Sequence, residues 1–240
     1  MVEKTIETIR KRSQKTRANY LERVSMMEAD PDSNRGMIGC SNLAHAAAGA
    51  IDDQGDLLKG QKPHIGIITA YNDMLSAHQP YENFPPILRA AIRQAGGTAQ
   101  VAAGVPAMCD GVTQGRPGME LSLSSRDVIA MATAIGLSHG VYDAALCLGV
   151  CDKIVPGLII GALSHGHVPV IMVPAGPMSS GLPNFEKAAR RKAFSRSEIG
   201  REELLKADAA SRAARRSSSG SARSSSGTVS RSSRSRRSCS

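Results

Sequence analysis

The sequence is poor in aromatic residues and in long apolar runs. Aromatic side chains make up 3% of the 240 residues and tryptophan is absent, so a buried core has to be built from Ala, Ile, Leu, Val and Met. No run of about 18 apolar residues is present, which excludes a membrane-spanning helix. The charged N-terminus does not resemble a secretory signal. We therefore expect a soluble, cytoplasmic protein with no membrane partner.

Cysteine is also scarce, and its spacing is irregular. Of the five cysteines, Cys239 lies near the C-terminus, and the other four are Cys40, Cys109, Cys147 and Cys151. This spacing is not typical of a disulfide framework, and in a cytosolic protein, thiols that share a site favour a metal or cluster role. We predict that Cys40 and Cys147 are buried structural thiols, because cysteine packs as a small apolar residue.

The positive charge is confined to one end of the chain. Residues 211–240 contain 8 Arg, 14 Ser and no acidic residue, which leaves 22 basic against 21 acidic residues in the first 210 positions. The nearly neutral part gives no argument for nucleic-acid binding. The Ser/Arg-rich segment cannot bury a core and is predicted to be disordered. It could attract polyanions by charge, but it lacks aromatic side chains for specific nucleic-acid recognition.

Apolar runs alternate with helix-like segments between residues 64 and 173. The predicted strands are 64–70, 98–105, 144–150 and 168–173, and the predicted helices between and after them are 87–94, 125–139 and 156–165. This alternation predicts an α/β fold, a doubly wound and mostly parallel sheet with flanking helices. Outside it we expect helices at 1–28, 40–51 and 199–210, with a loop at 52–62.

These patterns divide the chain into four parts. We expect an N-terminal helical segment (1–62), an α/β core (63–185) that carries the functional residues, a helical remnant (186–210) and the disordered tail (211–240).

Two of the predicted strands are followed by the same dipeptide. Cys109-Asp110 follows the second strand, and Cys151-Asp152-Lys153 follows the third. Ligands bind at the carboxyl ends of such strands, and neighbouring strand ends lie roughly 5 Å apart. Two carboxylates suit Mg²⁺, whereas thiolates suit iron–sulfur clusters. Lys153 belongs at a metal only as a neutral amine or a carbamate. Chance repetition of a polar dipeptide is the alternative explanation.

Longer motifs extend around both dipeptides. The stretches CDKIVPGLIIGA and CDGVTQGRPGMELSLSSRDVIAMATA resemble the dehydratase family that includes the dihydroxy-acid and phosphogluconate dehydratases. The loop TAYNDMLSAHQPYENFP and the stretch GHVPVIMVPAGPMSSGLPN resemble the phosphogluconate branch in particular. The likeness runs without interruption from about Gly66 to Asn184.

This resemblance implies the ligands of the site. The family has an N-terminal α/β domain with an iron–sulfur cluster, which is of the [4Fe–4S] type in the phosphogluconate branch. The resemblance also favours a homodimer. By matching position, Cys151 would bind the cluster and Cys109 would be a further cluster ligand. Asp110 and Asp152 would bind Mg²⁺, and Lys153 would join them as a carbamate and take part in catalysis.

The resemblance also implies a reaction. Water would be removed from 6-phospho-D-gluconate to give 2-dehydro-3-deoxy-6-phospho-D-gluconate in the Entner–Doudoroff pathway, with Lewis-acid assistance to the departing C3 hydroxyl. Backbone N–H groups before the helices near Ser125 and Pro156 could bind the phosphate. Two alternatives remain open: another sugar-acid or dihydroxy-acid dehydratase, and a non-catalytic protein whose basic tail binds polyanions. His78, His165 and His167 receive no role.

The sequence departs from the family after Ala210. There the family carries another cluster cysteine and then a β-rich second domain with a proposed serine base, whereas this sequence reads SRAARRSSSGSARSSS. A frameshift and a genuine basic tail both explain the change. We expect the C-terminal β-rich domain to be absent, and we expect the chain to be an incomplete enzyme with impaired cluster assembly and little turnover.

Overall fold

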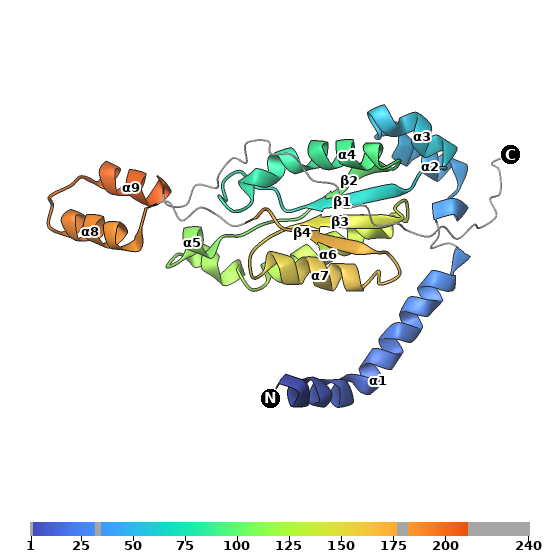
Figure 1. Cartoon of the computed structure of the whole chain (residues 1–240), viewed down its shortest axis with the longest axis horizontal. Helices are drawn as coiled ribbons and strands as arrows, with labels where there is room; N and C mark the ends of the chain where they lie inside the picture. The colour runs from blue at the N-terminus through green and yellow to red at the C-terminus, as the bar shows by residue number, and fades with distance from the viewer. Residues whose placement is uncertain (1, 32–34, 177–181, 211–240) are drawn as a thin grey trace.

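The computed structural model describes residues 2–31, 35–176 and 182–210, and within them the predicted α/β fold is confirmed. Four parallel strands form one sheet in the order β2-β1-β3-β4 (Figure 1). The strands are β1 (His64–Thr69), β2 (Thr98–Gly104), β3 (Ala144–Leu148) and β4 (Val170–Val173). The predicted tail, residues 211–240, lies outside the described residues.

Helices cover both faces of the sheet, as a doubly wound arrangement requires. The helices are α1 (Val2–Ala29), α2 (Cys40–Ala48), α3 (Gln54–Lys59), α4 (Phe84–Gln94), α5 (Asp110–Thr113), α6 (Ser125–Ser138), α7 (Ile154–Leu163), α8 (Asn184–Ser195) and α9 (Arg201–Ala210). Figure 1 shows α4 on one face of the sheet and α6 with α7 on the other. Short 3₁₀ turns include η4 (Gln79–Asn83) and η5 (Pro117–Leu121).

The core has two layers, one on each face of the sheet. On one face Ile68 and Cys147 pack against Ile129 of α6 and Leu158 of α7. On the other face the core is built from Ile67, Tyr81, Ala99 and Leu148, with side chains of α4 packed against them. Neighbouring residues of one strand point to opposite faces, which is why a run such as Ile67-Ile68 serves both layers.

Helices α6 and α7 approach each other closely at a glycine. A Cβ on Gly161 would lie 2.5 Å from the carbonyl oxygen of Ala130 and 2.5 Å from Cβ of Thr133. Only a residue without a side chain fits at that distance. The contact fixes α7, and therefore the loop that precedes it, against the rest of the domain.

A network of polar side chains joins the amino ends of the strands. The buried ring of His64 donates from Nε2 to Oε1 of Gln100 (3.0 Å) and accepts at Nδ1 from the Thr98 hydroxyl (2.8 Å). Its backbone N–H donates to Asp143 Oδ2 at 2.7 Å, and Arg35 pairs with the same carboxylate at 2.9 Å. The network ties β1, β2, β3 and the N-terminal segment together.

One prediction about the helices is wrong. Residues 52–62 are not a simple loop, because they contain η3 (Ile51–Asp53) and α3. Helix α8 lies mostly within the predicted helical remnant (186–210), although only 199–210 was given as a helix. Its sequence is strongly polar, and ion pairs with α9 stabilise it: Arg190 with Glu203 and Arg191 with Asp208, both at 3.2 Å. Strand and core-helix signals depend on apolar periodicity, and these segments have little of it.

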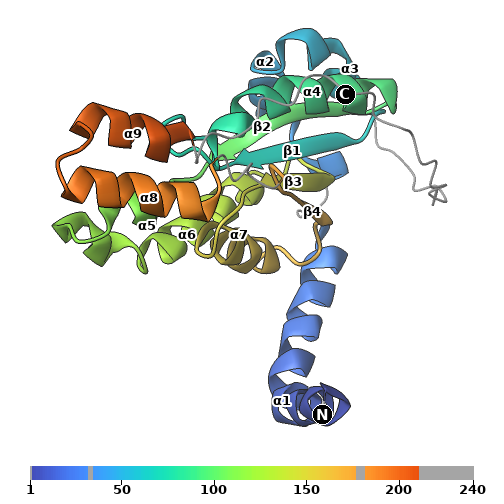
Figure 2. The ribbon, with the colours of Figure 1, turned by 60° about the vertical axis from the view of Figure 1, so that its left-hand side comes forward.

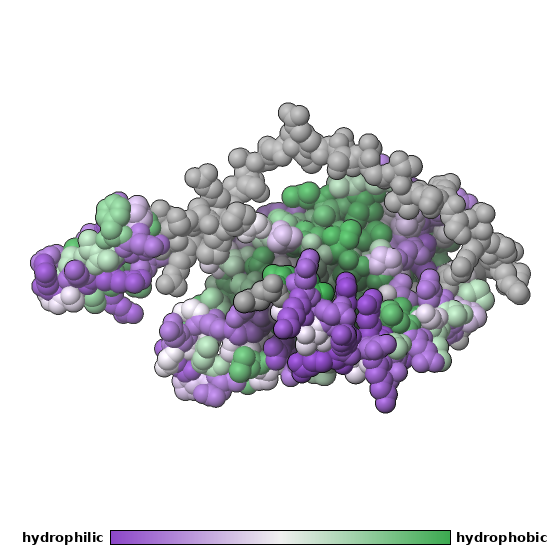
Figure 3. Space-filling view, turned by 60° about the horizontal axis from the view of Figure 1, so that its bottom comes forward, coloured by the Kyte–Doolittle hydropathy of each residue, from purple (hydrophilic) through white to green (hydrophobic). Residues whose placement is uncertain are grey.

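The surface has both strongly polar and apolar regions. Helix α1 extends away from the sheet (Figures 1 and 2) and its surface is strongly polar, while an apolar area lies beside it in Figure 3. Exposed apolar side chains occur on both α7 and β4, among them Ile160, Leu163 and Ile171. Among the described residues, no helix combines the length and the apolar character that crossing a membrane requires.

Candidate functional site

The two Cys-Asp dipeptides follow strands that are not neighbours. Strand β1 lies between β2 and β3, so the strand ends are roughly 10 Å apart, twice the spacing of adjacent strands. The condition under which the two dipeptides would share one cavity, adjacency of their strands, is therefore not met. They are still brought together, because the segment after β2 leads to α5 and the long side chain of Lys153 spans the remaining distance.

Lys153 connects the two carboxylates. Its Nζ donates to Oδ2 of Asp110 and lies 3.4 Å from both carboxylate oxygens of Asp152. Ser122 completes the environment of Asp110 by donating its hydroxyl to Oδ1 at 2.7 Å. Lys153 is buried, with 7% of its surface exposed, whereas the Asp152 side chain is 81% exposed. One buried cation therefore holds one well-anchored carboxylate and one open carboxylate.

The charges of this group reinforce one another. The hydrogen bond from Lys153, followed by that from Ser122, holds the pKa of Asp110 below its usual value. The same bond to Asp110 raises the pKa of Lys153 above its usual value, although partial burial opposes the shift. Asp110 is therefore a carboxylate and Lys153 an ammonium at neutral pH.

Two thiols accompany the charged group. Cys109 precedes the first residue of α5 and is half-buried, and Cys151 precedes α7 and is exposed. Although the residue as a whole is exposed, partial desolvation of its thiol, and then the charge on Cys109, raise the pKa of Cys151. Cys151 also has φ of +76°, a conformation that non-glycine residues rarely adopt and that is concentrated at functional sites.

The other cysteines lie elsewhere. Cys147 is buried in β3, and burial raises its pKa to about 12, so the prediction of a buried structural thiol is confirmed. Cys40 is exposed at the start of α2, and the prediction that it is buried is wrong. The small, Ala-rich segment around it buries other positions, among them Ala47.

The donor set fits Mg²⁺ better than it fits a cluster. The Lys153 ammonium lies between two carboxylates, where a cation would sit, and carboxylate oxygens are the ligands that Mg²⁺ takes. A metal could replace the ammonium only after Lys153 loses its proton. For a [4Fe–4S] cluster, Cys109 and Cys151 provide two of the usual four thiolates. The described part of the chain holds no group of three or more His, Cys, Asp or Glu that could bind a metal, so these residues alone complete the ligand set of neither the cluster nor Mg²⁺.

Two residues near the site were not predicted. Ser122 lies in a stretch rich in serine, so nothing in the sequence marks it as the partner of Asp110. His78 was given no role, yet it is fully buried at 1% exposure and its Nε2 donates to the carbonyl oxygen of Val150 at 3.3 Å. Its position in a polar loop that follows a buried strand was the available signal.

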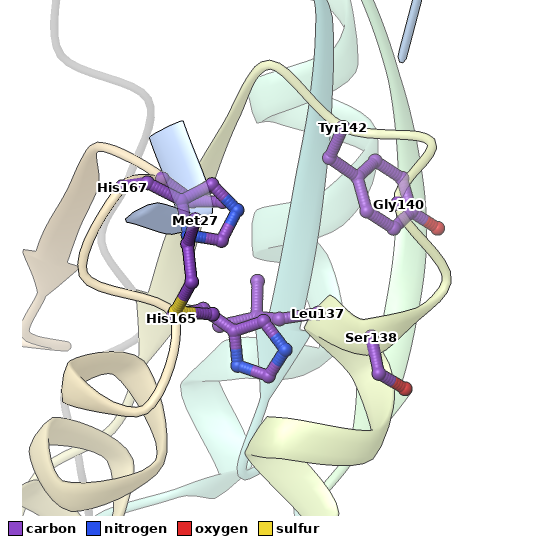
Figure 4. A pocket seen from close by; sticks show the side chains of 8 residues that line it. Met27, Leu137, Ser138, Gly140, Tyr142, His165 and His167 are labelled. Carbon is purple, nitrogen blue, oxygen red and sulfur yellow. The ribbon is translucent and has the colours of Figure 1, made fainter. Parts of the chain in front are cut away.

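A separate cavity lies at the opposite end of the sheet. It has a volume of about 200 Å³ and is lined by side chains that include Met27, Leu137, Tyr142, His165 and His167 (Figure 4). Burial, and then His167, lower the pKa of His165. None of the predicted site residues line this cavity.

Fold and geometry together define a class: an α/β protein in which a buried lysine contacts two aspartates, with two thiols nearby in the sequence, at the carboxyl ends of its strands. Residues 62–223 match the family model described as dihydroxy-acid/6-phosphogluconate dehydratase N-terminal. The chain belongs to this family. The match continues past Ala210 into the Ser/Arg-rich segment, where we expected the family likeness to stop.

Relatives with curated names distinguish the two branches. The phosphogluconate dehydratase of Rhizobium meliloti (strain 1021) is 58% identical over 201 residues, which are 83% of this chain and 33% of the relative. The phosphogluconate dehydratase of Escherichia coli (strain K12) is 54% identical over 201 residues, which are again 83% of this chain and 33% of the relative. The dihydroxy-acid dehydratase of Akkermansia muciniphila is 37% identical over 153 residues, which are 60% of this chain and 26% of the relative. The chain thus spans about a third of the length of these phosphogluconate dehydratases.

Proposed function

We propose that this chain forms the metal-binding part of a 6-phosphogluconate dehydratase, a hydro-lyase that forms 2-dehydro-3-deoxy-6-phospho-D-gluconate. The observation that carries the proposal is the convergence of Asp110 and Asp152 on Lys153 beside Cys109 and Cys151. The identity of 58% to a phosphogluconate dehydratase, against 37% to a dihydroxy-acid dehydratase, favours the sugar-acid substrate.

The residues of this chain have separate tasks in the proposed site. Asp110 stays ionised and is oriented by Ser122, so it presents a fixed oxygen ligand. Asp152 is exposed and can turn towards a cation or a substrate. When bound, Mg²⁺ would supply Lewis-acid polarisation of the substrate's oxygens. We assign no step to an iron–sulfur cluster, because the described residues offer only part of its ligand set.

Lys153 controls the charge of the site. Its ammonium offsets one of the two negative charges of Asp110 and Asp152 in the structure. A carbamate would form by addition of the neutral Nζ amine to CO₂ with release of a proton, so Lys153 would first have to lose its ammonium proton and its contact with Asp110. Most backbone N–H groups at the starts of α6 and α7 already donate to carbonyls of the chain, among them those of Asp127, Val155 and Gly157, so we assign them no contact with the substrate phosphate.

A chimera tests this function. Residues 1–210 would replace the matching stretch of the Rhizobium meliloti relative, whose remaining two thirds would supply the rest of the enzyme. We expect the anaerobically purified chimera to dehydrate 6-phosphogluconate and to leave a branched 2,3-dihydroxy acid unchanged. A chimera that folds and contains as much iron as the parent relative, but prefers the dihydroxy acid or dehydrates neither substrate, would contradict the proposal.

A further inference from the structure

The turn that carries Cys151 is fixed on its two sides by different contacts. On the helix side, the Cys151 carbonyl accepts from the backbone N–H of Val155 (3.2 Å) and the Lys153 carbonyl accepts from Gly157 (3.0 Å). On the strand side, the carbonyl of Val150 accepts from Nε2 of His78 at 3.3 Å. Because Cys151 has a left-handed backbone, its conformation is costly and persists only where the surrounding structure holds it.

His78 is itself held rigidly. Its backbone N–H donates to Leu75 (2.8 Å), its carbonyl accepts from Tyr81 (3.0 Å), and its ring is fully buried. The contact with a carbonyl requires the proton on Nε2, so Nδ1 is an unprotonated acceptor, and it has no hydrogen-bond partner among the described residues. Burial lowers the pKa of His78, which is consistent with this neutral form.

Three residues further on, Tyr81 holds a second strand end. Its buried hydroxyl donates to the carbonyl oxygen of Val173, the last residue of β4, at 3.0 Å. One segment after β1 therefore contacts the chain where both β3 and β4 end. The two contacts are separate, so they can be broken one at a time.

We propose that His78 is a positioning residue for Cys151: its Nε2–H fixes the Val150 carbonyl and so holds the Cys151 thiol in place where the chain leaves β3. The importance of that placement for catalysis rests on the proposed function. The placement of the thiol does not depend on the proposed function, because the reactivity of Cys151 can be measured without any catalytic turnover.

The test is the rate at which each cysteine of the metal-free, reduced chain reacts with iodoacetamide, resolved by peptide mass spectrometry. In His78→Leu the donor is lost, and we expect Cys151 to react about 5-fold faster, the factor that one ordinary hydrogen bond represents. The rate of Cys109 should stay within about 2-fold of the parent, as for a site without a changed contact.

Two further substitutions separate positioning from simple packing. The amide nitrogen of His78→Gln reaches the place of Nε2, so this variant should restore the parent rate at Cys151. The shorter His78→Asn reaches only the place of Nδ1 and should behave like His78→Leu. The comparison of the Gln and Asn variants distinguishes positioning from packing even if the leucine variant does not fold.

Tyr81→Phe is the matched control, because it removes only the contact to Val173 and should leave the Cys151 rate unchanged. An unchanged Cys151 rate in the Leu and Asn variants would overturn the proposal. So would equal acceleration of Cys109 and Cys151, or a Gln variant that behaves like Asn, since each would show general loosening rather than positioning.

Discussion

The two ends of the sheet use polar residues in opposite ways. At the amino ends of the strands, His64, Thr98 and Gln100 are bonded to one another, and Gln100 also donates to the carbonyl of Ala46. At the carboxyl ends, the buried ammonium of Lys153 contacts Asp110 and the exposed Asp152, and each of these aspartates follows a free cysteine. Polar groups that are hydrogen-bonded within the chain stabilise the fold, whereas clustered polar groups with unused hydrogen-bonding or ligand capacity are available for a ligand.

The largest expected effect on stability comes from breaking the amino-end network. His64→Leu removes the ring that contacts the Thr98 hydroxyl and Gln100 Oε1; Thr98 keeps its contact with the Pro63 carbonyl (3.3 Å), whereas Gln100 Oε1 is left unsatisfied. We expect the free energy of unfolding to fall by about 2 to 3 kcal/mol, measured by urea denaturation.

Asp152→Ala at the other end is the control for that measurement. Its side chain is 81% exposed, so the free energy of unfolding should change by no more than about 0.5 kcal/mol. Equal losses in the two variants would remove the distinction between the ends of the sheet.

A smaller effect is expected from pH. Burial lowers the pKa of His64 from 6.5, and burial likewise lowers that of His78. Just below pH 6.5 the unfolded chain therefore binds more protons than the folded chain, and stability falls as the pH drops towards the folded pKa values. Thermal unfolding between pH 7 and pH 5.5 checks this. We expect a smaller decline in His64→Leu, and stability that rises on acidification would contradict the assignment.

The sequence was informative where apolar periodicity was strong. All four strands and helices α4, α6 and α7 follow from it, because a doubly wound sheet needs apolar residues on both faces. Helix α3 was missed and the bounds of α8 were not located, since the stability of these helices comes from local turns and ion pairs that apolar patterning does not record. The α/β fold could therefore be predicted, while the polar borders of the domain could not.

The site was predictable in its residues but not in its geometry. The repeated Cys-Asp dipeptide identified Cys109, Asp110, Cys151 and Asp152 as candidates. The intervening β1 could not be placed from spacing alone, because strand order is decided by the packing of the whole sheet. The contact of His78 with Val150 joins residues 72 positions apart, and a single sequence holds no local signal for such a bond.

The central claim is that the carboxylates around Lys153 serve chemistry rather than stability. The most direct measurement compares Asp110→Asn with Asp56→Asn in the chimera, at equal iron content. Asp56 pairs with Lys62 at 2.6 Å on the partly exposed surface near the amino ends of the strands, so the same substitution there should leave kcat within about 2-fold of the parent. We predict that Asp110→Asn lowers kcat at least about 100-fold. An Asp110→Asn chimera that retains the parent kcat would contradict the claim.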